Sequence, residues 1–257
     1  MVEMRIAAQL YTLREYLNTP EEIYQSLTRV KEAGYKAVQV SGMGAVSPQK
    51  LKEITDELQL EICATHVSFD RLENDIEALI AEHKLWNCRY VGLGAMPERY
   101  KNSKKGYQEF AKKASRIGRE LNKNNLQFIY HNHNFELVRF GDLTGLDILF
   151  QESDPEVFDF ELDTYWLQAG GSDPVYWIRK MKERMKVVHF KDMVMDPKKG
   201  AIMAEVGEGN LNWPEIIKAC EDIGVKWCAV EQDICQRSPF KSLKISYDNL
   251  QDMGLKA

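Results

Sequence analysis

The sequence predicts an α/β fold, a single (β/α)8 TIM barrel that forms one domain over residues 1–257. Short apolar runs alternate with longer segments of helical period along the whole chain, and no linker or change of composition interrupts them. The length suits one large α/β barrel, since such domains run to about 200–250 residues. A doubly wound open sheet is the structural alternative. It normally carries a glycine-rich loop after its first strand, whereas QLYTLREY here contains no glycine.

Eight segments are predicted to form the strands of this barrel. Several are near-continuous apolar runs, which is typical of strands that are buried on both faces of a parallel sheet. The predicted strands are residues 5–11, 37–41, 61–69, 90–95, 127–133, 158–166, 186–192 and 228–233.

An amphipathic segment follows each predicted strand and is expected to form a helix. In the first, PEEIYQSLTRVKEAG, a proline and two acids mark the start of the helix and a glycine marks its end. The others are SPQKLKEITDELQ, ENDIEALIAEHKLWN, YQEFAKKASRIGRELNKNN, LTGLDILFQES, PVYWIRKMKERM, WPEIIKACEDIG and PFKSLKISYDNLQDMG.

Composition argues against nucleic-acid and membrane partners. The formal net charge is −5, and lysine and arginine are spread along the chain rather than gathered into a basic patch. No apolar run approaches the roughly 20 residues of a membrane helix, and the first residues lack the apolar region of a signal peptide. The five cysteines have scattered spacings, which is typical of reduced, buried thiols. A cytoplasmic protein is therefore expected, with a homo-oligomer possible.

Polar residues gather at the predicted carboxyl ends of the strands, where the active site of such a barrel lies. They are Gln9, Tyr11, Gln39, His66, His131, His133, Asp163, His189, Glu231 and Asp233. Side chains alternate along a strand, so His131 and His133 share the inward face while Phe128 and Tyr130 face the helices. Several acidic and imidazole side chains that meet at one end of the barrel cannot all be charged and shielded from water. They need a bound cation, a shared proton or water molecules.

A divalent metal satisfies such a group most simply. A lone histidine or aspartate at a strand end is more often a hydrogen-bonded structural residue. However, Asp163, His189 and Glu231 stand at three successive strand ends. Carboxylate and imidazole donors without thiolate suit Mn²⁺, Mg²⁺, Co²⁺ or Zn²⁺. The combination therefore predicts one divalent metal ion.

The motifs around these residues resemble the xylose-isomerase-like superfamily of barrels, and the resemblance covers nearly the whole chain. The motifs are ELDTYW, VVHFKD, VGEGNLNW and AVEQD. The group includes sugar and keto-inositol isomerases, D-tagatose 3-epimerase, inosose dehydratase and endonuclease IV repair enzymes. In it, carboxylates at strands 5, 6 and 8 and the histidine at strand 7 hold one metal. The resemblance thus implies Asp163, His189 and Glu231 as ligands, with Mn²⁺ as the first expectation.

The fourth ligand position departs from the family pattern. The isomerases and epimerases carry a glutamate at the end of strand 5, where this chain has His131, and the nearest glutamate is Glu136. In one arrangement, which we prefer, Glu136 completes the metal shell while His131 and His133 transfer protons. In the other, one of these histidines is the ligand and Glu136 binds a sugar hydroxyl. A histidine base suits the chemistry because its ordinary pKa lies near neutrality.

The resemblance implies an isomerase or epimerase that removes the proton next to the carbonyl of a ketose or keto-inositol, through an enediolate. His131, His133 and Glu231 are the expected catalytic residues. Loss of a β-oxygen would instead make the protein a lyase or dehydratase on a keto-cyclitol or 3-keto-glycoside. A sugar-binding barrel without turnover is a further alternative. A repair endonuclease is not expected, because it needs a three-metal cluster, more histidines and a basic surface.

Four further residues are expected to contact the sugar: Gln9, His66, Trp166 and Lys191. An aromatic face such as that of Trp166 could stack on a sugar ring, and Lys191 could polarise an oxygen atom. Lys191 is equally expected as an ion-pair partner of Asp192 or Asp163. The VGEGNLNW segment is expected to form a loop at the rim of the site that leads into a helix capped by Asn212.

Overall fold

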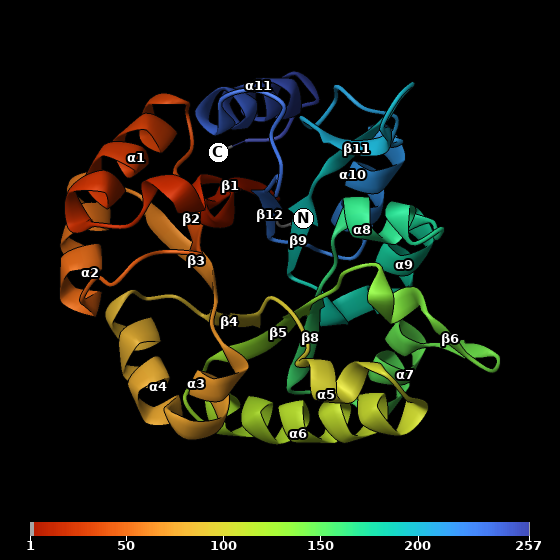
Figure 1. Ribbon diagram of the computed structural model, residues 1–257. Coiled ribbons are helices and arrows are strands. Elements are labelled where there is room, and N and C mark those ends of the chain that lie inside the picture. Colours follow the sequence, from red (N-terminus) through yellow and green to blue (C-terminus); the bar gives the residue numbers. More distant parts are fainter. Residues whose placement is uncertain (1–2, 257) are drawn as a thin grey trace.

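A computed structural model describes residues 3–256 and shows a ring of eight parallel strands with helices outside it (Figure 1). The strands are β1 (Arg5–Gln9), β2 (Ala37–Val40), β3 (Glu61–His66), β4 (Tyr90–Leu93), β5 (Gln127–His131), β8 (Phe158–Glu161), β9 (Val187–Phe190) and β12 (Trp227–Val230). Their order is β8-β5-β4-β3-β2-β1-β12-β9. The ring closes between β8 and β9, where the His189 N–H donates to the Leu162 carbonyl over 2.8 Å. The predicted barrel is confirmed.

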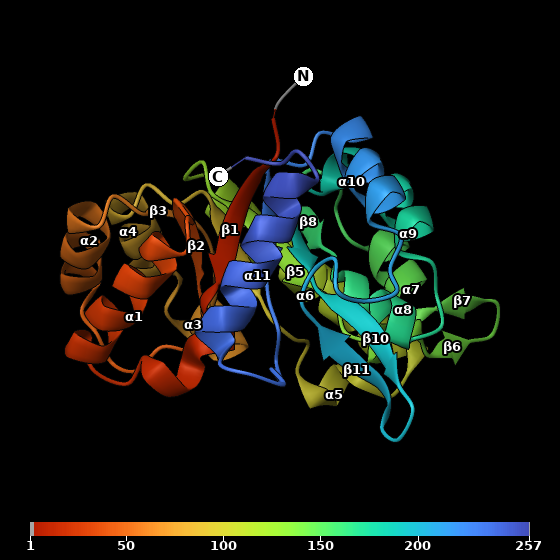
Figure 2. The same ribbon diagram turned by 90° about the horizontal axis from the view of Figure 1, so that it is seen from above.

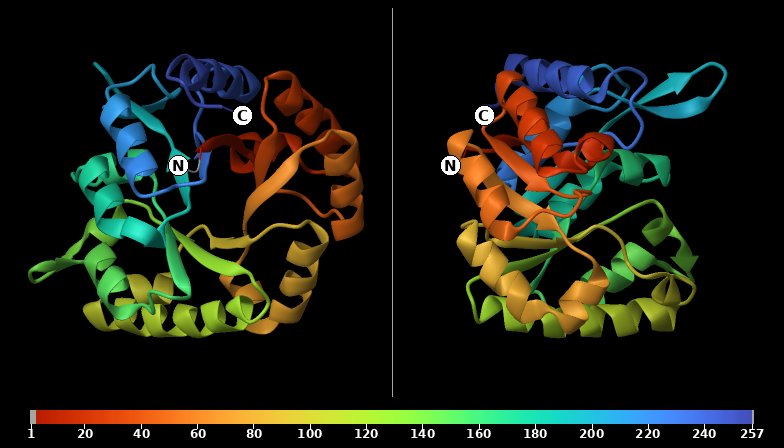
Figure 3. Two further views of the ribbon diagram at one scale, coloured as in Figure 1. Left: turned by 180° about the vertical axis from the view of Figure 1, so that it is seen from behind. Right: turned by 60° about the vertical axis from the view of Figure 1, so that its left-hand side comes forward.

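Helices surround the strands on all sides, as the views in Figure 3 show. The α-helices are α1 (Pro20–Glu32), α2 (Pro48–Glu57), α3 (Phe69–Asn74), α4 (Ile76–Leu85), α5 (Glu98–Lys101), α6 (Lys104–Asn122), α7 (Gly145–Glu152), α8 (Thr164–Ala169), α9 (Pro174–Met181), α10 (Trp213–Asp222) and α11 (Pro239–Asp252). Short 3-10 helices are η1 (Leu10–Tyr16), η2 (Phe135–Leu137) and η3 (Lys182–Arg184). The helix expected in LTGLDILFQES is present as α7, where Thr144 and Asp147 form a reciprocal capping box.

All eight strands end before the predicted bounds, and in two of them a polar side chain at the strand end bonds to the backbone and starts a helix. β1 stops at Gln9, whose side chain accepts a hydrogen bond from the Tyr11 N–H at the start of η1. The predicted strand 158–166 divides into β8 and α8, since Asp163 accepts from the Trp166 N–H over 2.9 Å. Such residues serve both as helix caps and as candidates for the site.

An antiparallel hairpin that the sequence reading did not predict follows β9. It consists of β10 (Asp192–Asp196) and β11 (Gly200–Ala204), and it projects away from the end of the barrel where β1 begins (Figure 2). A smaller hairpin of β6 (Arg139–Phe140) and β7 (Leu143–Thr144) precedes α7. The VGEGNLNW segment follows β11, and Asn212 caps α10 as predicted.

The apolar core has two layers. The outer layer packs the helices against the outward faces of the strands. The inner layer fills the barrel with Ala7, Ala37, Cys63, Ala64, Tyr90, Ile129, Val187, Trp227 and Ala229. The many small residues leave room for the two large rings, Tyr90 and Trp227, so the interior is packed rather than hollow.

The lengths of the helices and the burial of the cysteines bear on two expectations from composition. Within residues 3–256, every helix is too short or too polar to cross a lipid bilayer. The five cysteines carry free thiols, four of them buried and Cys235 half-buried, as predicted. Burial raises the pKa of Cys88 to about 12, so its thiol is protonated and unreactive at neutral pH.

Asp159 is a buried acid at the amino end of β8, away from the polar residues at the strand ends. It pairs in register with Ile129 and is 8% exposed. Burial raises its pKa to about 6, although Arg184, Lys186 and Arg89 act in the opposite direction. Because this folded-state pKa exceeds the pKa of Asp159 in the unfolded chain, the folded state binds the carboxyl proton more tightly. Stability is lost as pH rises through the folded pKa.

Asp159→Asn is therefore expected to raise the free energy of unfolding at pH 8 by roughly 2–3 kcal/mol. The gain should nearly vanish at pH 4, where the carboxyl group of the wild type is protonated in the folded state. Urea unfolding at the two pH values measures this. Equal changes at both pH values would show that the effect comes from packing and not from ionisation.

Candidate functional site

Four side chains from four strands meet at the carboxyl end of the barrel. His131 ends β5, Asp163 follows β8, His189 lies in β9 and Glu231 follows β12; all four are buried. One donor atom from each lies within 4.8 Å of all the others. His189 Nδ1 is 2.9 Å from Glu231 Oε2 and 3.9 Å from Asp163 Oδ2. The three ligands implied by the family resemblance are thus brought together, with His131 as the fourth member.

The donors in this cluster fit a divalent cation. Two imidazoles and two carboxylates without thiolate suit Mn²⁺, Co²⁺ or Zn²⁺. Neighbouring ligand atoms lie ~3 Å apart when their bonds to the ion are ~2.1 Å, and His131 Nε2 lies 4.0 Å from Asp163 Oδ2. Asp163 Oδ2 is buried and accepts no hydrogen bond among residues 3–256, although Lys191 Nζ forms an ion pair with it at 3.0 Å. A small inward movement would bring the four donor atoms to the spacing that one ion requires.

Lys191 places a positive charge beside the same carboxylates. Its Nζ lies 3.0 Å from Asp163 Oδ2, 2.9 Å from Glu231 Oε2 and 2.6 Å from Asp233 Oδ2. Burial opposes its ionisation, but the three carboxylates overcome this and raise its pKa. The expected ion pair with Asp163 is confirmed, and Asp192 is not a partner. Because Asp233 remains available, Lys191 would keep an ion pair if the other two carboxylates bound a metal.

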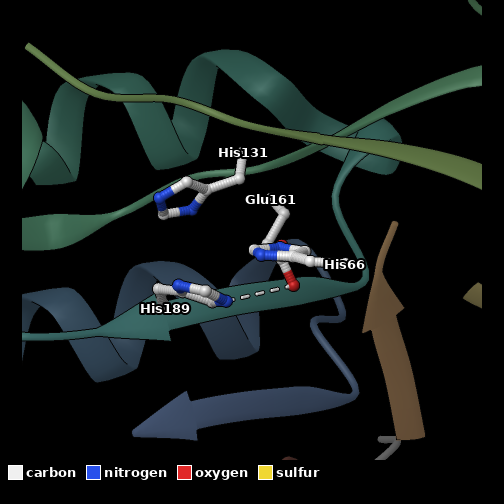
Figure 4. A group of neighbouring side chains, drawn as sticks. All are labelled: His66, His131, Glu161 and His189. Atoms are coloured by element: carbon white, nitrogen blue, oxygen red, sulfur yellow. Dashed lines mark hydrogen bonds and ion pairs between the residues drawn. The ribbon is translucent and has the colours of Figure 1, made fainter. Parts of the chain in front are cut away.

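Glu161 is a functional candidate that the sequence reading missed. Its Oε2 lies 2.5 Å from His66 Nε2, and its Oε1 lies 3.3 Å from His189 Nε2. Figure 4 shows these side chains together, with the contact between Glu161 and His189 as a dashed line. Gln39 donates to Glu161 Oε1 over 2.8 Å and accepts from His189 Nε2 over 2.9 Å. Burial raises the pKa of Glu161, but His189 and His66 outweigh it and lower that pKa to about 2. The sequence does contain an indication of this role, because alternation along the strand places Glu161 on the same face as Asp163.

These contacts assign the two nitrogens of His189 to different tasks. Nδ1 faces Asp163 and Glu231, whereas Nε2 faces Gln39 and Glu161. Metal-binding histidines usually donate their second N–H to a carboxylate or carbonyl oxygen, which fixes the ring. His66, His131, Glu161 and His189 also lie close enough to form a second group of possible ligands. Both nitrogens of His189 have partners. Nδ1 pairs with Glu231, a member of the first group, whereas Nε2 also pairs with Gln39, which belongs to neither group, so the group containing Asp163 and Glu231 is the better candidate.

Glu136 does not complete this cluster, which corrects the preferred expectation. Its Oε1 accepts from the Tyr130 hydroxyl over 2.5 Å, and its Oε2 accepts from the His133 N–H over 2.9 Å. Tyr130 faces the helices, so both oxygens of Glu136 are occupied outside the barrel interior. Burial raises the pKa of Glu136 to about 7, although both hydrogen bonds act to lower it. The second arrangement, with a histidine in the strand-5 position, agrees with this geometry.

A cavity of about 340 Å³ opens beside the cluster. Its wall includes Tyr11, His66, His131, His133, Glu231 and Asp233. The other expected sugar contacts, Gln9, Trp166 and Lys191, lie behind this wall. Gln9 Nε2 is 3.5 Å from His66 Nδ1, and the Trp166 ring lies 5.3 Å from that of His133. These two residues therefore support wall residues, and only His66 of the four lines the cavity.

His133 contributes an uncharged imidazole to the cavity wall. Its ring lies 5.0 Å from that of His131, and its Nδ1 has no hydrogen-bond partner among residues 3–256. Burial lowers its pKa to about 4, with a further contribution from the Lys191 charge. At neutral pH His133 is therefore free to accept a proton or a hydrogen bond. His83, the remaining histidine, is buried in α4 and bonds to Thr65, so it is a packing residue.

Comparison with known proteins identifies the family. Residues 27–239 match the model of the xylose isomerase-like TIM barrel. The chain belongs to this family. The match covers the strands that carry His131, Asp163, His189 and Glu231.

Relatives in this family carry names of two reaction classes. An inosose dehydratase of Lacticaseibacillus casei is 21% identical over 254 residues, which cover 84% of this chain and 85% of that protein. A sugar phosphate isomerase/epimerase structure from Parabacteroides distasonis has a TM-score of 0.82 at 21% identity, covering 99% of this chain and 96% of that one. The probable 3-DHS dehydratase of Bacillus anthracis has a TM-score of 0.72 at 18% identity, covering 96% and 99%.

Proposed function

We propose that this protein is a divalent-metal-dependent enzyme that removes the proton next to the carbonyl of a ketose or keto-inositol. The observation that carries the proposal is the buried group of His131, Asp163, His189 and Glu231 at the edge of a cavity lined by two further imidazoles. Isomerisation and epimerisation both begin with this proton removal and differ in where a proton returns. The isomerase and epimerase names within the family agree with it.

His131, Asp163, His189 and Glu231 are the proposed ligands, and Mn²⁺ is the first expectation, with Mg²⁺, Co²⁺ and Zn²⁺ as alternatives. When bound, the ion would supply a Lewis acid for the negative charge that develops on the carbonyl oxygen of the substrate. His131 then holds the metal and does not transfer protons. Gln39 and Glu161 keep His189 oriented through its Nε2. Lys191 holds Asp163 and Glu231 in place.

Dehydration is the second candidate reaction, and two observations favour it. The curated relatives that match most of the chain are named inosose dehydratase. In addition, His66 and Glu161 provide a second proton-transfer group on the cavity wall. Dehydration needs a proton to leave carbon and another to reach the departing oxygen. A keto-inositol is the substrate class that this reaction would use.

A hydrogen-exchange experiment tests the shared first step. Ketoses, keto-inositols and 3-keto-glycosides are incubated with the protein and Mn²⁺ in D₂O, and deuterium next to the carbonyl is measured by NMR. We expect metal-dependent exchange for at least one class. Movement of the carbonyl to a neighbouring carbon identifies an isomerase, inversion at a carbon next to the carbonyl identifies an epimerase, and loss of water identifies a dehydratase. Binding of a sugar without exchange would favour a sugar-binding barrel instead.

The two strand-5 histidines are expected to respond differently to substitution. His133→Ala should lower turnover by roughly 10²–10³-fold, because His133 is the proposed group for proton transfers at the substrate oxygens. It should keep metal binding, measured as the rise of melting temperature with Mn²⁺. His131→Ala should lose both, since it removes a proposed ligand. Full turnover in both variants would show that these histidines are structural.

A further inference from the structure

His66 and Glu161 form a hydrogen-bonded pair beside the metal cluster. His66 lies at the end of β3 and Glu161 at the end of β8, and β4 and β5 lie between these strands in the sheet. The Nε2 of His66 is 2.5 Å from Glu161 Oε2, and the side chain of Glu161 is fully buried. An ionised carboxylate at Nε2 holds the N–H on that nitrogen, so Nδ1 carries the lone pair. Gln9 Nε2, 3.5 Å from Nδ1, is a donor and agrees with this tautomer.

The structure leaves space beside Nδ1 of His66. Gly94 lines the same cavity, and a Cβ atom placed on it would lie 3.0 Å from Nδ1. Gly92 also faces this ring, where a Cβ atom would lie 2.8 Å from Cδ2. The absence of side chains at these two positions lets the imidazole stand in the cavity wall. The His66 ring lies 5.3 Å from both the His131 and His189 rings, close to the proposed metal ligands.

We propose that His66, oriented by Glu161, is the base that removes the proton next to the carbonyl. This inference rests on the proposed function and adds a catalytic residue to it. His66 lines the cavity and is not needed as a ligand by the group containing Asp163 and Glu231. Its Nδ1 is an accepting nitrogen that Gln9 Nε2 approaches to 3.5 Å, a distance at which a hydrogen bond is weak and readily exchanged. Glu161 is then a positioning residue, because it acts through His66. His133 is left to serve proton transfers at the substrate oxygens.

The step balances without any further reactant. Nδ1 of His66 takes the proton of the C–H bond, and the electron pair of that bond moves toward the carbonyl carbon, leaving an oxyanion. Return of this proton to the neighbouring carbon gives an isomer. An epimer forms when a second group delivers a proton to the same carbon from the opposite face, and His66 then releases its proton to solvent. If His66 instead gives the proton to a departing β-hydroxyl, the C–O bond breaks with its electron pair, and water and an unsaturated ketone form. In each case His66 regains its neutral state.

The test compares four variants in the D₂O assay with Mn²⁺, using whichever keto compound the wild type exchanges. His66→Asn should lower exchange by roughly 10²–10⁴-fold, as expected for loss of a general base. Glu161→Gln should lower exchange by roughly 10–100-fold, because the ring loses its charged partner. Gly94→Ala keeps every polar group and crowds Nδ1 with one methyl group, and it should lower exchange by roughly 10–100-fold. His133→Ala should retain exchange while turnover falls.

Each variant is also checked for the rise of melting temperature with Mn²⁺, which should persist in His66→Asn and Gly94→Ala. Unchanged exchange in both variants would overturn the inference while leaving the proposed function intact. So would loss of the metal-dependent rise in both, since His66 would then support the metal site. Loss of exchange in His133→Ala with retention in His66→Asn would assign the base to His133. A wild-type protein that exchanges none of the compounds would refute the proposed function itself.

Discussion

Mn²⁺ added to chelator-treated protein is expected to raise the melting temperature, and Asp163→Asn or Glu231→Gln should abolish the rise. At an ion concentration of about 100 times Kd, binding stabilises the folded state by about 2.7 kcal/mol. For a chain of this size that corresponds to a shift of roughly 5–10 °C. Asp163 and Glu231 come from different strands, so they bind one ion together only in the closed barrel. The substitutions preserve shape and remove only the charge of a ligand.

Glu136→Gln is the matched control for this experiment. It makes the same chemical change in a buried glutamate whose oxygens bond to Tyr130 and His133 outside the cluster. Its melting temperature should still rise with Mn²⁺. Loss of the rise in Glu136→Gln would restore Glu136 as a ligand. If the wild type shows no stabilisation with Mn²⁺, Co²⁺, Zn²⁺ or Mg²⁺, the metal-dependent function fails.

Asp192→Ala is expected to lower the free energy of unfolding by about 3–5 kcal/mol, because it removes a buried acceptor with several donors. Its carboxylate is fully buried at the start of β10. The donors are the N–H groups of Met193, Gly207, Gly209 and Leu211 at 2.7–3.2 Å and the indole N–H of Trp213 at 2.5 Å. One side chain thus holds the VGEGNLNW segment against the hairpin.

Urea unfolding measures this loss, and Asp196→Ala is the control on the same hairpin. Asp196 accepts from the N–H groups of Lys198 and Lys199 in the turn, where water can replace it. Its substitution should cost much less than that of Asp192. Equal losses would mean that the segment is held by other contacts. Because VGEGNLNW does not line the cavity, Asp192 is assigned to stability and not to substrate binding.

The barrel and three of its proposed ligands follow from the sequence by itself. Alternating apolar and amphipathic segments determine the fold class, since each strand and helix must bury one face. The period of two along a strand then places Asp163, His189 and Glu231 inward at one end. These are local properties of the chain, readable without knowing which strands are neighbours. The hairpin β10–β11 was missed because its residues lack a strong apolar alternation and depend on Asp192 for anchoring.

Only the tertiary structure decided between His131 and Glu136, because sequence distance does not say which way a side chain turns after a strand ends. Tyr130 and the His133 N–H draw Glu136 outward and leave His131 beside Asp163. For the same reason, the sequence does not predict the contact between His66 and Glu161, which are 95 residues apart. A contact of that range exists only once the strands close into a ring. The burial and the partners of a polar side chain set its chemistry, and both depend on the whole barrel. The pattern of apolar residues that forms the barrel, in contrast, lies within each segment.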